Sequence, residues 1–338
     1  MRETDVKPAP PGGEEVDAEA DHDVDTDGGA DADTAADADT AADADGAGDA
    51  DTSADADTAA DAGAPKVVVV GGGVAGLTAG IFTARAGMDT VVLDHGESIL
   101  RRNSHLENMP GFPAGVNSRL FLDLLAEQAR RSGCLFEQGL VTNLQTLGDG
   151  AGEDTLEGVE DDESGGTGGG EETDTSGFQL RVEADEEYDL RADYVIVASW
   201  SDTDYLERID GVGLTRRGSK TFVDVDDFGR TGCDGLYAAG RIAEKPHQTV
   251  VCAGHGAEVA LTLVDDSPVP FYHDWVAPEG YFTERGHDVP PGVEEIDEEE
   301  RRRRERESME VMREAFAEPH ADEPTMHPSV VEKRRDGE

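Results

Sequence analysis

Three glycines and one aspartate have the residue types and the spacing of a phosphate-binding turn. Gly71, Gly73 and Gly76 fit the pattern G-x-G-x-x-G, and Asp94 lies near the roughly 20-residue separation at which such turns place an acidic residue. Gly71 allows a tight turn, Gly73 lets the backbone approach a pyrophosphate, and Gly76 lets a helix and a strand pack closely. The Asp94 carboxylate can accept hydrogen bonds from ribose hydroxyls. Together these residues predict a dinucleotide site.

The segments around this turn are of the kinds that must position it. Residues 66–70, KVVVV, read as a buried parallel strand because the run is short, apolar and β-branched. A helix of small residues is predicted over 77–86, and a second strand over 90–93 ends next to the acid. The helix N-terminus offers free N–H groups and a positive dipole end to phosphates. The alternative is a glycine loop that only packs. The site residues expected here are Gly71, Gly73, Val74, Ala75, Gly76 and Asp94.

The charge of the chain restricts its environment and its partners. Asp and Glu number 77 against 28 Lys and Arg, which gives a formal net charge of -49. Such a surface repels itself in dilute buffer, whereas molar salt reduces the screening length to about 3 Å. We therefore expect a halophilic protein from a salt-rich cytoplasm. The negative charge argues against nucleic acid and anionic membranes as partners.

The cysteines and the apolar runs exclude several other classes of protein. Cys134, Cys233 and Cys252 are the three cysteines, and no pair has C-x-x-C spacing. The sequence therefore predicts no disulfide framework, zinc site or redox dithiol. No opening signal segment is recognised, and no run reaches the roughly 18 apolar residues of a membrane span. We expect a soluble, cytoplasmic protein without a bound metal.

Composition divides the chain into five segments. Residues 1–64 contain a six-residue Asp/Ala/Thr repeat that cannot bury a core, and we expect this acidic tail to be disordered. Residues 65–267 read as one α/β domain, with an acidic loop insertion at 148–177. An aromatic and Pro-rich cover segment follows at 268–292, then a charged helix at 293–317 and a loose tail at 318–338.

The expected elements of the α/β domain continue beyond the second strand. An amphipathic helix is predicted over 119–131, and a third strand lies within 134–147. Further strands are expected at 178–182, 187–190, 194–198, around 223–225 and at 236–239, and a helix at 249–264. In the charged helix, i,i+4 pairs are expected between Glu298 and Arg302, Glu299 and Arg303, and Glu300 and Arg304.

Several motifs resemble the flavin domain of a known family. They are the first glycine turn with its acid, ENMPGFPAG at 107–115, YDLRADYVIVAS at 188–199, TGCDGLYAAGR at 231–241 and HQTVVCAGHGAEVAL at 247–261. Together they resemble thioredoxin-reductase-like, FAD-dependent pyridine nucleotide-disulfide oxidoreductases. The resemblance implies a Rossmann-like three-layer α/β fold, with a parallel sheet, helices on one face and a small antiparallel sheet on the other. It implies FAD as the cofactor.

The resemblance also assigns cofactor contacts. The three glycines of the turn would hold the FAD pyrophosphate, and Asp94 the adenosine ribose. Asn108 and Pro110 would lie beside the isoalloxazine, and Gly240 would let the backbone approach the ribityl chain. Gln248 and Thr249 would open a helix whose N-terminus faces the flavin.

The chain departs from the family pattern at several places, among them the segment after the acid, where ESILRRN at 97–103 replaces the usual G-G-Q. Arg241 replaces the Asp of A-A-G-D; it would either pair with the pyrophosphate or obstruct the ribityl path. Trp200 stands where A-T-G has its glycine. The segment between YVIVA and AAG is too short for the family's NADPH domain, and the dithiol of that domain is missing too.

These observations favour an FAD-binding oxidoreductase that lacks its own nicotinamide domain. A separate electron-donor protein or a diffusing reductant would supply the electrons. One alternative is a non-catalytic, decayed dinucleotide-binding module that acts through partners. Another is a protein with a single NAD site, but the AAG–helix segment has no use in such a domain.

Overall fold

The computed structural model describes residues 63–148, 177–270 and 273–335. The chain divides into two units, Met1–Ala60 and Asp61–Glu338, and all described residues belong to the second. The acidic tail predicted over 1–64 and the acidic insertion over 148–177 lie outside the described residues, apart from a few at their ends.

A five-stranded parallel sheet in the order β10-β7-β1-β2-β3 forms the centre of the domain. Its strands are β1 (Lys66–Val70), β2 (Asp89–Asp94), β3 (Leu135–Gln138), β7 (Tyr194–Val197) and β10 (Leu236–Ala238). The Val-rich β1 pairs with β2 on one side and β7 on the other, in parallel register. Burial on both faces explains why its sequence is continuously apolar.

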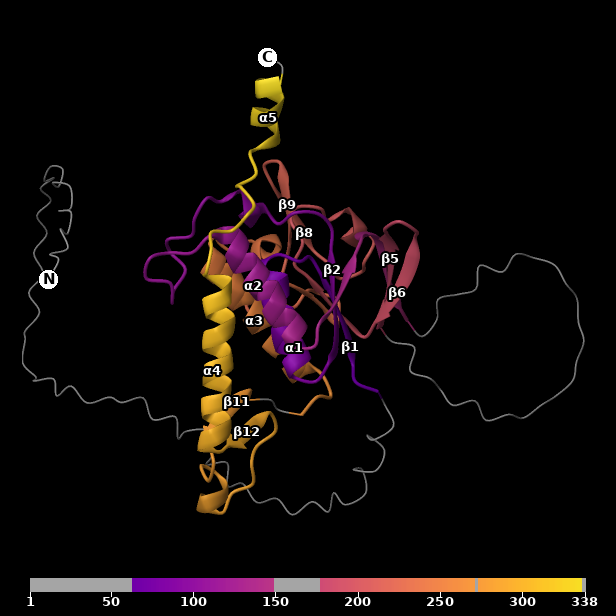
Figure 1. Ribbon diagram of the computed structural model, residues 1–338. Coiled ribbons are helices and arrows are strands. Elements are labelled where there is room, and N and C mark those ends of the chain that lie inside the picture. The colour runs from indigo at the N-terminus through magenta and orange to yellow at the C-terminus, as the bar shows by residue number, and fades with distance from the viewer. Residues whose placement is uncertain (1–62, 149–176, 271–272, 336–338) are drawn as a thin grey trace, which may run out of the picture. The chain divides into compact units, whose positions relative to one another are not determined.

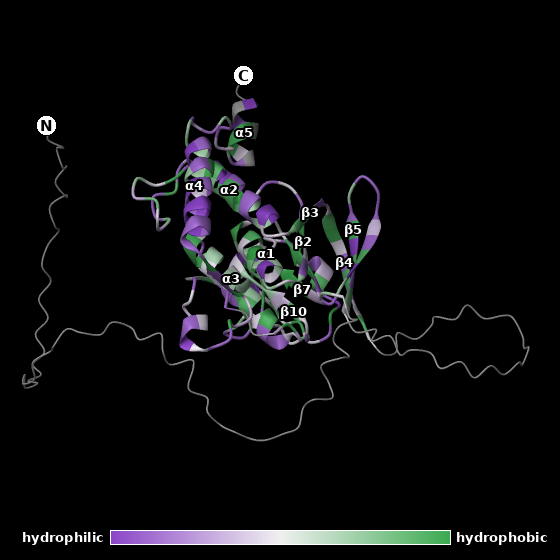
Figure 2. Ribbon diagram, turned by 60° about the horizontal axis from the view of Figure 1, so that its bottom comes forward, coloured by the Kyte–Doolittle hydropathy of each residue, from purple (hydrophilic) through white to green (hydrophobic). Residues whose placement is uncertain are grey.

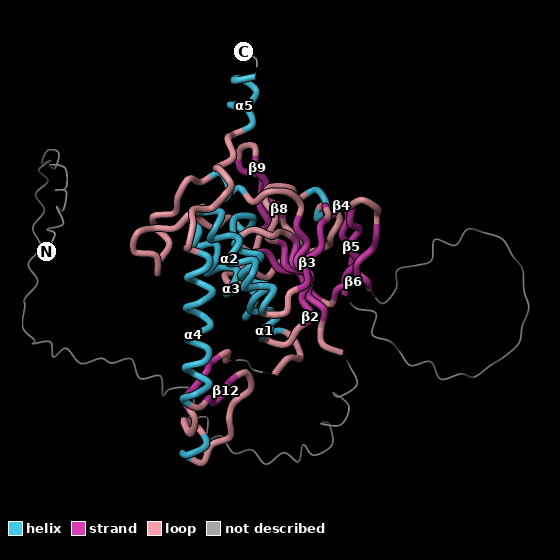
Figure 3. The backbone as a smooth tube through the Cα atoms, viewed as in Figure 1, coloured by secondary structure: helices cyan, strands magenta, loops and turns pink. Residues whose placement is uncertain are grey.

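Alternate residues of β1 enter two separate cores, because successive side chains of a strand point to opposite faces. Val67 and Val69 join a core with helices α1 (Val74–Arg85), α2 (Ser118–Arg131) and α3 (Thr249–Asp266). Val68 and Val70 join a core with the antiparallel sheet β4-β5-β6. The strands of that sheet are β4 (Leu140–Leu147), β5 (Gly177–Glu183) and β6 (Tyr188–Ala192). Helices and antiparallel strands thus lie on opposite sides of the central sheet (Figures 1 and 3). The expected three-layer fold is confirmed.

Some predicted elements differ from the observed ones. Helix α1 begins at Val74, inside the glycine motif, because the small residues of the motif fit the first turn packed on the sheet. The stretch 134–147 holds two strands, β3 and β4, that belong to different sheets. The strand near 223–225 is half of a hairpin, β8 (Leu214–Arg217) with β9 (Lys220–Val223), and Val225 lies outside it. The described residues also form short 3-10 turns: η1 (Ile99–Arg102), η2 (Asp204–Leu206), η3 (Gly240–Ala243) and η4 (Thr283–Arg285).

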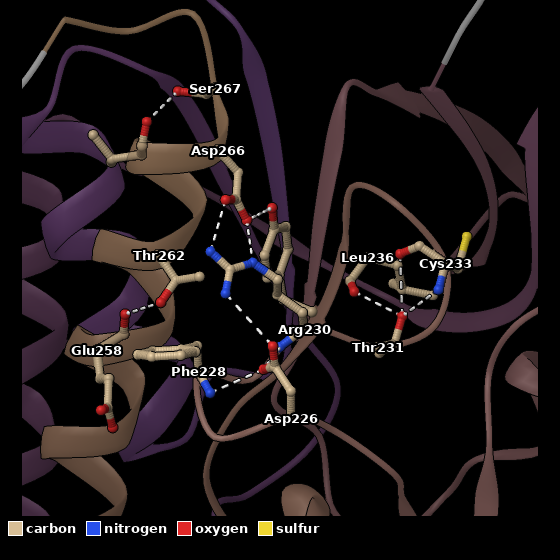
Figure 4. A network of polar contacts seen from close by, with 12 residues as sticks. Asp226, Phe228, Arg230, Thr231, Cys233, Leu236, Glu258, Thr262, Asp266 and Ser267 are labelled. Carbon is tan, nitrogen blue, oxygen red and sulfur yellow. Dashed lines mark hydrogen bonds and ion pairs between the residues drawn. The ribbon is translucent and has the colours of Figure 1, made fainter.

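An ion-pair network holds the C-terminal end of α3 against β10 (Figure 4). The Arg230 guanidinium donates to both carboxylate oxygens of Asp266, at 2.6 and 2.7 Å. The Tyr237 hydroxyl donates to the same carboxylate at 2.9 Å. Asp226 accepts from the backbone N–H groups of Phe228 and Arg230, both at 2.9 Å. These contacts fix the direction of α3 relative to the sheet.

The segment after the domain begins with a two-stranded parallel sheet. Strands β11 (Trp275–Pro278) and β12 (Val293–Ile296) pair with each other, so the predicted charged helix starts later than expected, as α4 (Glu298–Ala315). The Asp297 carboxylate caps α4 by accepting from Glu300 N–H at 2.8 Å. Helix α4 is largely hydrophilic (Figure 2). Two of its three predicted ion pairs form, whereas Arg303 pairs with Glu300 and Glu307 instead of Glu299.

The prediction of a loose tail after residue 318 is wrong for part of that tail. The His320 ring lies 2.8 Å from the Asp123 carboxylate of α2, and the carbonyl of Asp322 accepts from the buried Arg119 at 2.9 Å. Helix α5 (Pro328–Arg335) follows. Burial of Arg119 explains the difference, because a buried guanidinium needs acceptors and the tail supplies one.

Candidate cofactor site

A cavity of about 500 Å³ lies at the carboxyl ends of β1, β2 and β7, where open parallel sheets bind their ligands. Its volume is within the range of small-molecule sites. The predicted residues that line it are Gly71, Gly73, Val74, Ala75, Asp94, Asn108, Arg241, Gln248 and Thr249. The predicted residues Gly76, Pro110 and Gly240 do not line it. The first glycine turn and the motifs at 231–241 and 247–261 therefore meet in one cavity.

The three glycines of the turn do different work. Gly71 has φ +120°, and a Cβ there would lie 2.7 Å from the backbone nitrogen of Ser199. A Cβ on Gly76 would overlap the carbonyl oxygen of Gly71, so Gly76 serves packing rather than contact with a ligand. A Cβ on Gly73 would meet only the Ser98 hydroxyl, at 3.9 Å. Among the described residues, therefore, no atom crowds the position that a side chain at 73 would occupy, and the backbone there is open on the cavity side.

Two helix N-termini open into the cavity without a side-chain cap. Gly73, which has no side chain, precedes α1, and the side chain of Gln248, which precedes α3, does not cap its helix. By contrast, α2 and α4 are capped by the side chains of Asn117 and Asp297. The first N–H groups of a helix have no partner within that helix. The cavity therefore presents free donors and two positive dipole ends to a ligand.

Asp94 lies against the glycine turn. Its carboxylate accepts hydrogen bonds from the backbone of Gly72 and His95, but burial dominates and raises the pKa of the carboxyl. A Cβ on Gly72 would come within 2.5 Å of the Asp94 carboxyl carbon. The glycine at 72 therefore leaves room for the acid. The sequence pattern missed this role, because 72 is a free position in G-x-G-x-x-G.

Asn108 and Gln248 lie far apart in the sequence and meet at the other end of the cavity. The Asn108 side-chain nitrogen donates to Gln248 Oε1 at 2.7 Å. This contact joins the 107–115 motif to the start of α3, as expected of two residues beside one ligand. Pro110, two residues further on, is exposed and does not contribute to the lining.

Gly240 is positioned by a buried histidine. Its N–H donates to His255 Nδ1 at 2.8 Å, and burial lowers the pKa of His255 to about 4. Gly240 has φ +75°, and a Cβ there would lie 2.6 Å from the Ala75 side chain. Gly240 therefore lets η3 pack against the first turn of α1 and does not itself contact the cavity.

Cys252 lines the cavity in the first turns of α3. Burial raises the pKa of its thiol, although Arg241 and the backbone of Gln248 oppose the rise. A thiol with a raised pKa is a weak nucleophile at neutral pH. This favours a packing role. Neighbouring His247 also lines the cavity, and burial and the charge of Arg241 lower its pKa.

Several lining residues were missed by the sequence pattern. The Ser199 hydroxyl lies 3.1 Å from that of the buried Tyr205, and both line the cavity beside the glycine turn. Ser98, Asn103 and His105 line it from the loop after β2. The position of Ser199, just after the end of β7, could have predicted its place at the cavity. The loop residues had no such signal, because only the fold brings them back to the sheet.

The loop that supplies Asn103 is held from outside the cavity. The buried Arg119 guanidinium donates to the carbonyl oxygens of Arg101 and Asn103, at 3.2 and 2.8 Å. The Ser118 hydroxyl donates to the Asn103 carbonyl as well. Because Arg119 also binds the carbonyl of Asp322, the C-terminal segment and the cavity loop share one anchor.

Two family models match separate parts of the chain, and the second match begins within the acidic insertion. Residues 66–106 match the model described as an FAD binding domain, and residues 165–256 match that of the pyridine nucleotide-disulphide oxidoreductases. These matches contain the glycine turn, Asp94, Gly240 and the start of α3. The chain contains an FAD-binding domain of the thioredoxin reductase type. The resemblance inferred from the motifs is thereby confirmed.

Curated relatives of this FAD domain are thioredoxin reductases. The enzyme of Aquifex aeolicus is 40% identical over 77 residues, which cover 22% of this chain and 24% of that protein. The Chlamydia trachomatis enzyme is 38% identical over 73 residues, covering 20% and 23%. The chain thus spans less than a quarter of the length of either relative. Among solved structures, the chain is similar to an oxidoreductase of Agrobacterium tumefaciens, with TM-score 0.45 and 13% identity over 60% of this chain and 98% of that one.

The cavity residues fit FAD. Two uncapped helix N-termini suit phosphate and an electron-rich ring edge, and Gly73 leaves the backbone open on the cavity side. Buried Arg241 Nε has no hydrogen-bond partner in the part of the chain that the structure describes, so the wall also holds a donor in need of an acceptor.

The FAD domain contains no second nucleotide-binding unit where its pattern would place one. Residues 198–235, all of which the structure describes, form η2 and the β8–β9 hairpin between β7 and β10. The cysteines are all free. Among the described residues, no helix is both long and apolar enough to cross a bilayer.

Proposed function

We propose that this protein is an FAD-dependent oxidoreductase whose flavin domain exchanges electrons with a separate donor. The observation that carries the proposal is the convergence of the glycine turn, Asp94 and the Asn108–Gln248 pair on one cavity of about 500 Å³. The first two elements belong to a general dinucleotide site. The third lies at the uncapped N-terminus of α3, where a plain NAD-binding unit has no corresponding element.

Each part of the cavity has a defined task in this proposal. The backbone at Gly71–Gly73 and the N-terminus of α1 hold the pyrophosphate, and Asp94 accepts from the adenosine ribose. Asn108 and Gln248 orient the ring system, and the positive end of α3 favours negative charge on it. Bound FAD supplies the redox chemistry, so the domain itself needs no general base.

The electron donor must come from outside the domain. Residues 198–235 offer no room for a nicotinamide domain, and the described cysteines form no dithiol. We expect no thioredoxin reductase activity with NADPH and thioredoxin alone. A steady turnover at an ordinary enzyme rate, about 1–10³ per second, would contradict this expectation.

Flavin content and reducibility test the proposal. The protein is purified in molar salt, denatured and filtered, and the filtrate is examined for FAD; the intact protein is also titrated with FAD. We expect noncovalent FAD, and we expect chemically reduced protein to be reoxidised by an added electron acceptor. A colourless protein whose melting temperature does not change when FAD is added would refute the proposal.

A second candidate function is a non-catalytic module that binds a dinucleotide without turning it over. The observation in its favour is the contact of Arg241 with Trp200, which places two large side chains in the cavity wall. Stoichiometric FAD that can be neither reduced nor reoxidised by small mediators would favour this candidate.

A further inference from the structure

Arg241 is a cation of the cavity wall that has no counterion among residues 63–148, 177–270 and 273–335. Its side chain lines the cavity, and its guanidinium carbon lies 4.7 Å from the ring centroid of Trp200, a cation–π distance. The Nε atom is buried and has no hydrogen-bond partner among the described residues. A buried donor is normally satisfied, so this one indicates a missing acceptor.

The lack of a carboxylate partner is notable in so acidic a chain. Arg217, on the neighbouring hairpin, pairs with Glu244, and Arg230 pairs with Asp226 and Asp266. Arg241 forms no ion pair within the described part of the chain. Although Asp and Glu number 77 and Asp94, Glu97 and Asp202 line the same cavity, none of these three pairs with the Arg241 guanidinium.

Trp200 is itself held in place by the β8–β9 hairpin. The Phe222 ring lies 5.0 Å from the Trp200 ring, and Lys220 Nζ lies 5.6 Å from the Trp200 centroid. Lys220 also donates to the Ser201 hydroxyl at 3.0 Å. Phe222, Trp200 and Arg241 therefore form a continuous series of contacts from the hairpin into the cavity wall, in which the Phe222 ring is tilted by 41° to the Trp200 ring.

The backbone places this series of contacts beside the end of the cavity where α1 begins. Arg241 follows Gly240, and Gly240 lies against Ala75 in the first turn of α1. The free N–H groups of that turn are the donors expected to hold a pyrophosphate. A guanidinium complements them, because it offers several N–H donors in a planar fork to phosphate oxygens.

We propose that Arg241 binds a phosphate of the dinucleotide and that Trp200 is its positioning residue. The cavity then selects FAD over flavins that lack phosphate. This inference rests on the proposed function, since it concerns the same cavity. The hairpin in the segment between β7 and β10 thereby acquires a task, which is to hold a cation against the cofactor.

The affinities for FAD and for riboflavin, which has no phosphate, test the inference in the full-length protein in molar salt. Arg241→Met should weaken FAD binding at least about tenfold, equivalent to about 1.4 kcal/mol, and leave riboflavin binding unchanged. Arg241→Asp should weaken FAD binding further, through repulsion of the phosphates. Arg217→Met is the matched control, because Arg217 is paired with Glu244 and does not line the cavity; its FAD-to-riboflavin affinity ratio should equal that of the unmodified protein.

Variants of Trp200 separate positioning from bulk structure. Trp200→Leu should lose most of the FAD affinity that depends on Arg241. Trp200→Phe, which keeps an aromatic face, should retain much of that affinity. The Leu change should add little to Arg241→Met, since both remove one interaction. Unchanged or tighter FAD binding by Arg241→Met or Arg241→Asp would overturn this inference but not the proposed function. Failure of the unmodified protein to bind FAD would overturn the proposed function with it.

Discussion

The cavity has two walls that are built in different ways. Residues 66–94, the first wall, are contiguous and present mainly backbone, through the turn between β1 and α1. The second wall combines separate segments and presents side chains, among them Trp200, Arg241 and Gln248. In the first wall an added Cβ at Gly71 or Gly76 meets main-chain atoms. The second wall carries the departures from the family pattern. A backbone wall restricts residue type, whereas a side-chain wall can change its chemistry within the same fold.

The largest expected effect comes from a methyl group in the backbone wall. Gly76→Ala places a Cβ over the carbonyl oxygen of Gly71, so the turn must move; overpacking of this kind costs about 1–3 kcal/mol. We expect a lower melting temperature and loss of FAD binding. Gly73→Ala is the control, since its Cβ would meet only Ser98 Oγ, at 3.9 Å. This variant should melt like the unmodified apoprotein yet bind FAD weakly. Equal melting temperatures and equal FAD affinities of the two variants would contradict the assignment of Gly76 to packing and Gly73 to ligand approach.

Two glycines of α3 test how closely the walls are joined. Gly256→Ala would overlap the carbonyl oxygen of Ala75 and push α3 away from α1. We expect destabilisation together with weaker FAD binding. Gly254, two residues earlier on the same helix, is exposed, and an added Cβ there would have no described atom within 4 Å. Gly254→Ala should stabilise the protein by up to about 1 kcal/mol through helix propensity. Thermal melts of both variants measure the contrast, and a destabilised Gly254→Ala would argue against it.

His255 should make the second wall sensitive to acid. Burial lowers its pKa from 6.5 to about 4, so the folded state favours the neutral ring, which accepts the Gly240 N–H. Its contribution to stability is therefore present above pH 6.5 and lost as pH falls from 6.5 through about 4. His255→Gln should reduce this part of the acid loss. The free energy of unfolding of both proteins, measured across that pH range, shows the difference, and parallel curves would contradict the assignment.

The smallest effect is expected at Cys252. Its thiol lines the cavity, but burial raises the pKa of the thiol and favours the neutral form. Cys252→Ser should leave FAD affinity and reoxidation by small acceptors within about twofold of the unmodified protein, because a neutral thiol at this position packs rather than reacts. A reduced rate of flavin reoxidation at unchanged affinity would show that the thiol takes part in electron transfer.

The first wall could be predicted from the sequence nearly in full. A Val-rich strand, a glycine turn, a helix and an acid follow one another along the chain, and their order fixes their geometry. The start of α1 was misplaced by three residues, because glycine motifs read as loop although their small residues fit a helix turn. The second wall was predicted only through family motifs. Gly240 and Pro110 were assigned to the cofactor there, but Gly240 packs against Ala75 and Pro110 is exposed.

The sequence by itself determined the elements whose evidence is local: the parallel strands, the turn that exposes helix N–H groups, and the shortness of the segment between β7 and β10. Only the tertiary structure decided which distant residues meet. It brought Asn108 to Gln248, stacked Arg241 on Trp200 and gave the tail carbonyl of Asp322 to Arg119. The reason is physical. Strand and helix periodicity follow from neighbouring residues, whereas side-chain contacts between remote segments depend on how the two faces of the sheet are covered.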